Sequence, residues 1–72
     1  FTVPTEWTAR HAWNFMRAAE SFGTPFAIAL GDRTIVAQRA VAYRPGIHNR
    51  KPLLESPSGQ EVQFMSGVLV VR

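Results

Sequence analysis

The sequence contains no cysteine, so this 72-residue chain has neither disulfide bonds nor thiolate metal ligands to stabilise it. Its longest uncharged runs reach only half of the roughly 20 apolar residues that a membrane-spanning helix needs, and no signal-peptide pattern opens it. We therefore expect no membrane insertion. A chain this short buries only about 60% of the surface of its unfolded form, so its stability must come from packing or from partners.

Charged residues are also scarce, at 18% of the chain, and they are unevenly placed. Residues 1–32 carry slightly more acids than arginines, whereas residues 33–54 hold cations only: Arg33, Arg39, Arg44, Arg50 and Lys51. A local basic field of this kind attracts phosphate groups or acidic protein surfaces. The charge pattern is thus an argument about partners, not about the fold.

Hydrophobic residues make up 46% of the chain and include five Phe, two Trp and one Tyr, which favours a folded domain over a disordered chain. The length predicts a single small domain over residues 1–72. Since the first residue is Phe1 and not Met, we expect a processed chain or a fragment of a longer protein.

The first part of the chain predicts an amphipathic helix over residues 6–22. Thr5 is placed to cap its start, Gly23 is placed to end it in a left-handed conformation, and Pro25 prevents continuation. At about 100° per residue one apolar stripe forms, which consists of Ala12, Phe15, Met16, Ala19 and Phe22. This stripe is expected to face the core.

The rest of the chain predicts antiparallel strands. Segments 26–30 and 34–44 form a hairpin, a short strand is expected at 53–55 before the turn at 56–59, and a last strand covers 60–72. The apolar end of that last strand is typical of a central strand. We therefore predict an α+β fold in which one N-terminal helix packs on a small antiparallel sheet of three to four strands.

Residues suited to catalysis are few. His11 and His48 are the only histidines and Asp32 is the only aspartate, and no catalytic triad, metal-ligand spacing or phosphate-binding glycine loop is present. His11 is expected to pack beside Trp7 and Phe15, which lie four residues before and after it. The sequence predicts a non-enzymatic protein without a cofactor or a metal site.

The polar side of the predicted helix carries an unusual residue, Trp13. Arg10 lies three residues before it and Arg17 four residues after it, so the three side chains can meet on the surface. In one interpretation the sheet or the arginine stems cover Trp13. In the other, Trp13 stacks on a nucleic-acid base or anchors a protein interface.

The stretch 44–52, "RPGIHNRKP", is predicted to be an exposed connector that begins with a Pro-Gly turn. Its cations Arg44, Arg50 and Lys51, with Arg39 in the preceding strand, form a basic segment. The segment is either an anion-binding loop or a solvated linker.

Two functions follow from these features. The first is a module that binds DNA or RNA through seven residues: Arg10, Trp13, Arg17, Arg39, Arg44, Arg50 and Lys51. The alternative is a structural or protein-interaction subunit of a larger assembly, such as a virion or a multiprotein complex. There the loop meets an acidic protein partner, or the chain self-associates through an edge strand.

Overall fold

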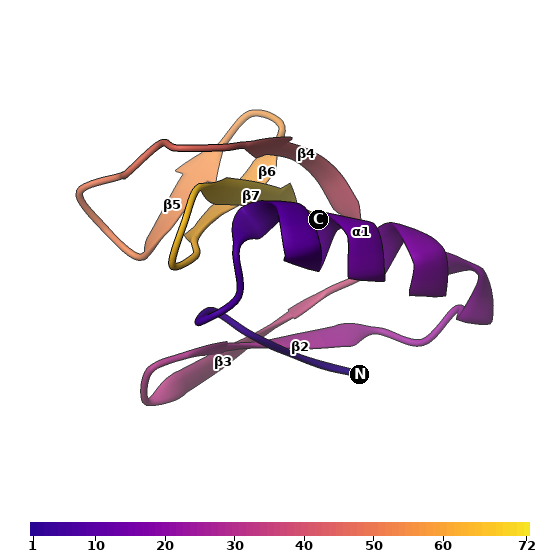
Figure 1. The fold of residues 1–72 in the computed structure, drawn as a ribbon. Coiled ribbons are helices and arrows are strands. Elements are labelled where there is room, and N and C mark those ends of the chain that lie inside the picture. Colours follow the sequence, from indigo (N-terminus) through magenta and orange to yellow (C-terminus); the bar gives the residue numbers. More distant parts are fainter.

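The computed structural model describes residues 1–72 and contains one α-helix and seven strands in two sheets (Figure 1). The helix α1 (Ala9–Ala19) continues into a short 3₁₀ turn, η1 (Glu20–Phe22). The first sheet has the order β1-β2-β3, formed by β1 (Thr2–Pro4), β2 (Phe26–Leu30) and β3 (Arg33–Ala37). The second has the order β4-β7-β6-β5, formed by β4 (Ala40–Arg44), β5 (Leu53–Ser56), β6 (Gly59–Gln63) and β7 (Val68–Val71). The predicted α+β class is confirmed.

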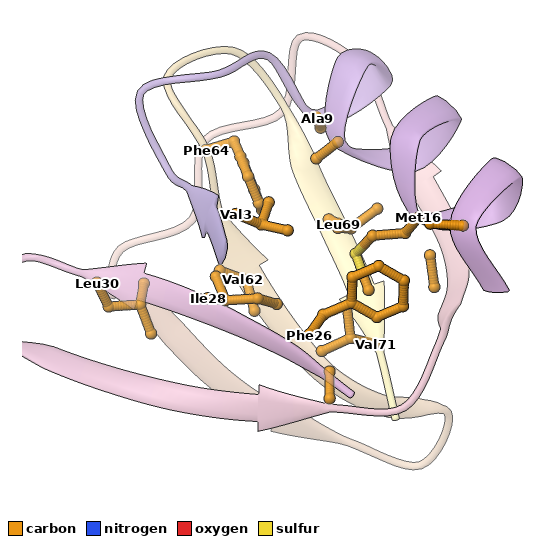
Figure 2. Close-up of a cluster of buried hydrophobic side chains, with 14 residues drawn as sticks. Val3, Ala9, Met16, Phe26, Ile28, Leu30, Val62, Phe64, Leu69 and Val71 are labelled. Atoms are coloured by element: carbon orange, nitrogen blue, oxygen red, sulfur yellow. The ribbon is translucent and has the colours of Figure 1, made fainter. Parts of the chain in front are cut away.

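Helix α1 packs on the antiparallel second sheet, mainly on β4 and β7. In Figure 1 the β2–β3 hairpin lies below the helix, and β4 and β6 lie above it. One apolar cluster joins the helix to both sheets (Figure 2), and its most deeply buried large side chains are Val3, Met16, Phe26, Ile28, Val62, Leu69 and Val71. No helix is long and apolar enough to cross a membrane.

The predicted start of the helix is wrong by three residues, because Thr8 and not Thr5 caps it. The Thr8 hydroxyl accepts a hydrogen bond from the His11 N–H at 3.1 Å. The carbonyl of Thr5 instead accepts from the Met65 N–H at 2.8 Å, so this segment is tied to the β6–β7 loop. The predicted end is confirmed, since Gly23 has a φ of 73°.

The predicted apolar stripe holds for most of the helix but fails at its end. Ala12, Met16 and Ala19 are buried, and Phe15 is half-buried, whereas Phe22 is 73% exposed. Phe22 lies beyond the end of α1, in the 3₁₀ turn η1, and its ring lies 5.9 Å from the ring of Phe1, which is itself exposed.

The strand predicted over 34–44 is in fact two strands in different sheets. The chain leaves the first sheet after Ala37 and enters the second at Ala40. Gln38 and Arg39 make the crossing, and both of their N–H groups donate to the carbonyl of Arg72. The break depends on a partner at the far end of the chain, which local periodicity does not reveal.

The strand predicted over 60–72 is also two strands, β6 and β7, which form a hairpin. The Phe64 N–H donates to the Gly67 carbonyl at 3.0 Å, and Gly67 has a φ of 91°. Strand β7 is central and fully buried, as the apolar end of the sequence predicted.

Strand β1 was not predicted; it pairs in parallel with β2, and Val3 enters the core.

Candidate anion-binding cleft

An open cleft of about 410 Å³ lies where the end of α1, the crossing between the sheets and the β5–β6 turn meet. Its lining residues are Arg17, Arg39, Ala40, Val41, Pro57, Ser58 and Arg72. Three of these are arginines, and none is an acid. The arginines come from parts of the chain that are far apart in the sequence, and the fold brings them together.

Backbone pairing holds two of these arginines side by side. The Arg39 N–H donates to the Arg72 carbonyl at 3.2 Å, and the Arg72 N–H donates to the Arg39 carbonyl at 3.0 Å. The Arg72 side chain is fixed further, because its Nε donates to the Ser58 carbonyl at 2.7 Å. That bond ties one wall of the cleft to the β5–β6 turn.

The third arginine, Arg17, lies over the ring of Trp13. Its guanidinium carbon is 5.3 Å from the ring centroid, within the range of a cation–π contact. Trp13 is half-buried, packs on the core and lies 5.4 Å from the Tyr43 ring of β4. The sheet and an arginine therefore both cover Trp13, as the first of the two interpretations predicted, and Trp13 supports Arg17.

The cleft keeps most of its positive charge. Arg17 has one acidic neighbour, Glu20, at 3.8 Å, and both side chains are solvent-exposed, so this ion pair is weak. Arg39 and Arg72 form no ion pair. Guanidinium groups with free donors bind the oxygens of phosphate and carboxylate in a forked geometry. The cleft is thus suited to an anion.

Arg44 is paired within the protein. Its Nη1 lies 3.2 Å from Glu61 Oε2 on β6. The same carboxylate accepts a bond from Asn49 Nδ2 at 3.1 Å, and the Asn49 N–H donates to Gln63 Oε1 at 2.6 Å. The middle of the connector, at Asn49, is therefore anchored to β6, although most residues of the connector are exposed.

The remaining predicted site residues lie elsewhere. Arg50 and Lys51 line a separate cleft of about 510 Å³, where the hairpin turn contributes the carboxylate of Asp32. Arg10 is exposed on α1 and does not line the arginine cleft. The structure thus brings together Arg17 and Arg39 from the predicted set, with Trp13 beneath Arg17.

Arg72 and Ser58 were missed by sequence reasoning. The sequence shows a basic last residue and a turn at 56–59, but nothing local indicates that these two meet Arg39. The contact arises because β7 runs antiparallel to β4 and β6, which places its end beside the start of β4 and the β5–β6 turn.

Neither of the two histidines lines the arginine cleft. The His11 ring packs edge-on against Trp7 at a centroid distance of 4.4 Å, as the spacing predicted. No three of the His, Asp and Glu side chains gather where they could hold a metal ion.

Comparisons with known proteins give no relative: no protein-family model matches the chain, and no curated protein and no solved structure matches it either.

Proposed function

We propose that this chain binds the sugar–phosphate backbone of DNA or RNA, without catalysis, through the cleft of Arg17, Arg39 and Arg72. One observation carries the proposal: three arginines from distant parts of the chain line one open cleft that no acidic residue lines. Two of them have no carboxylate partner. Phosphate diesters satisfy such donors, and arginine favours them because its fork matches two phosphate oxygens.

The cleft supports backbone contact more than base recognition. Trp13, the residue best suited to stack on a base, is half-buried under Arg17 and beside Tyr43. Contacts to phosphates position a protein without reading the sequence. The proposed binding is therefore tolerant of sequence and dependent on salt.

A titration of labelled oligonucleotides by fluorescence anisotropy tests the proposal. If all three arginines contact phosphates, log affinity falls against log salt concentration with a slope of about −2.7 on duplex DNA and about −2.1 on single strands. Unrelated sequences should bind equally. Absence of binding to every DNA and RNA at low salt would end the proposal.

The alternative, a subunit of a larger assembly, has support from a different part of the molecule. Strand β3 has a free edge, which is a surface on which another strand can pair. An assembly subunit differs from a nucleic-acid-binding module in forming a defined oligomer that depends little on salt.

A further inference from the structure

The two sheets have four edge strands, and three of them carry features that discourage pairing with another chain. Strand β1 has three residues, one of which is Pro4. The register of β4 shifts between Ala40 and Ala42, and β5 directly follows Pro52 and contains Glu55. Prolines, charges and bulges are the usual means of blocking an edge.

Strand β3 differs, because it has neither a proline nor a bulge and no charge in its middle. It pairs with β2 in an unbroken register of five residues, contains no proline, and carries its one charge, Arg33, at the hairpin end. Val36 of β3 is 64% exposed. No strand lies on its outer side (Figure 1). An open edge with an exposed β-branched side chain is a pairing surface.

The hairpin geometry shows which backbone groups this edge offers. Gly31 has a φ of 62° and Asp32 has a negative φ, which fits a two-residue type II′ turn. In such a hairpin the residues flanking the turn, Leu30 and Arg33, form a hydrogen-bonded pair, and bonded pairs then alternate with non-bonded ones. Thr34 and Val36 therefore direct their N–H and C=O groups away from β2.

An observed hydrogen bond supports this alternation. Ala27 is the β2 partner of Val36, and its N–H donates to the Phe1 carbonyl on the β1 side at 2.7 Å. Ala27 thus faces away from β3, as a member of a non-bonded pair must. Its partner Val36 faces the free edge.

We infer that β3 pairs antiparallel with β3 of a second copy of this chain, with Thr34 of each copy opposite Val36 of the other. In this register the four outward-facing residues exchange four N–H···O bonds about a twofold axis at Ile35. If the register between the two copies shifted by one residue, the outward-facing N–H and C=O groups of Thr34 and Val36 would lie opposite residues whose own backbone groups already bond β2. The edge is therefore self-complementary.

The side chains are compatible with the same register. Val36 lies beside Thr34 of the second copy on the outer face, which reduces the exposure of Val36. Arg33 lies opposite Ala37, so the two arginines sit at opposite ends of the paired strands and do not repel each other directly. No residue of β3 lines the arginine cleft, and the inference does not depend on nucleic-acid binding.

Sedimentation equilibrium without nucleic acid tests the inference. The apparent mass is expected to rise with concentration toward twice the 8.0 kDa of one chain as the chain concentration approaches about 1 mM. Val36→Lys should raise the dissociation constant at least about tenfold, because lysine blocks edges. Met65→Lys is the control, since Met65 is equally exposed, at 64%, and lies off the edge; it should leave the constant unchanged.

Amide hydrogen exchange by NMR provides a second test that needs no variant. The amides of Thr34 and Val36 should become protected as concentration rises, whereas the amide of Ile35, which bonds β2, should be protected throughout. A chain that remains a monomer at about 1 mM would overturn the inference. A dimer in which Thr34 and Val36 exchange freely, and which Val36→Lys leaves intact, would equally overturn it.

Discussion

The guanidinium carbon of Arg17 lies 5.3 Å from the centroid of the Trp13 ring, four residues earlier on α1, and Arg17 lines the arginine cleft. Trp13 is held in turn by the core and by Tyr43 of β4. A tryptophan on the polar side of a helix thus has a structural reason for its position. It orients one of the three arginines of the proposed site.

Trp13→Leu tests this role. The variant keeps an apolar side chain on the core but loses a cation–π contact worth about 0.5–1 kcal/mol at an exposed site. Because this contact orients Arg17 before binding, nucleic-acid affinity should fall, by no more than about two- to fivefold. The salt slope should not change, because all three arginines remain. A loss of about 1–3 kcal/mol confined to single strands would show instead that Trp13 stacks on bases. Anisotropy titrations on both kinds of oligonucleotide distinguish these results.

Gln63 is predicted to hold the connector and the β6–β7 turn together. Its Nε2 carries two hydrogens and lies within hydrogen-bond distance of three carbonyl oxygens, those of Ile47, Phe64 and Gly67, and its Oε1 accepts from the Asn49 N–H. Gln63→Leu should lower the free energy of unfolding by about 2–4 kcal/mol, measured by urea denaturation.

Gln60→Leu is the matched control, because the Gln60 side chain makes one exposed hydrogen bond, to Glu55. Its effect should stay within about 0.5 kcal/mol. If Gln63→Leu and Gln60→Leu lowered the free energy of unfolding by equal amounts, the proposed role of Gln63 would be contradicted.

Gly67 is predicted to be less replaceable than Gly46. Both have positive φ angles, of 91° and 74°. A Cβ at Gly67 would lie 2.9 Å from the Arg44 carbonyl oxygen and 3.0 Å from the Ala9 Cβ, whereas a Cβ at Gly46 would meet nothing within 4 Å. Gly46→Ala should cost about 1–2 kcal/mol from backbone strain alone, and Gly67→Ala clearly more. Thermal melts that rank Gly46→Ala as the more damaging would refute this packing.

Phe26 and Phe22 are predicted to differ strongly, although both adjoin the end of the helix. Phe26 is fully buried, so Phe26→Ala should cost about 3–5 kcal/mol and threaten folding. Phe22 is 73% exposed, so Phe22→Ala should cost less than about 1 kcal/mol. If denaturant unfolding showed comparable losses of stability for Phe26→Ala and Phe22→Ala, the apolar stripe of the helix would have to include Phe22.

The elements that the sequence predicted well are those with local signals. Gly23 ended the helix where it was expected, and the turns predicted at 31–33 and 56–59 each joined two strands, although Arg33 already belongs to β3. Each of these depends on the backbone preferences of a few adjacent residues.

The elements that were missed depend on distant partners. The break at Gln38 and Arg39 is stabilised by the carbonyl of Arg72, and Arg44 meets Glu61 only because β4 and β6 share a sheet. The residues of the candidate site also depend on partners that are distant in the sequence. Periodicity placed Arg17 on the polar side of the helix, but only the fold shows that Arg39 and Arg72 lie beside it.

The most direct test of the arginine cleft compares two double variants of equal charge. Arg17→Gln with Arg39→Gln removes two cations from the cleft, and Arg50→Gln with Lys51→Gln removes two from the connector; each lowers the net charge from +3 by two. The salt dependence of duplex binding should flatten from a slope of about −2.7 to about −0.9 in the cleft variant and stay near −2.7 in the connector variant. A slope that flattens in the connector variant and not in the cleft variant would contradict the proposed site and make 44–52 the anion-binding loop.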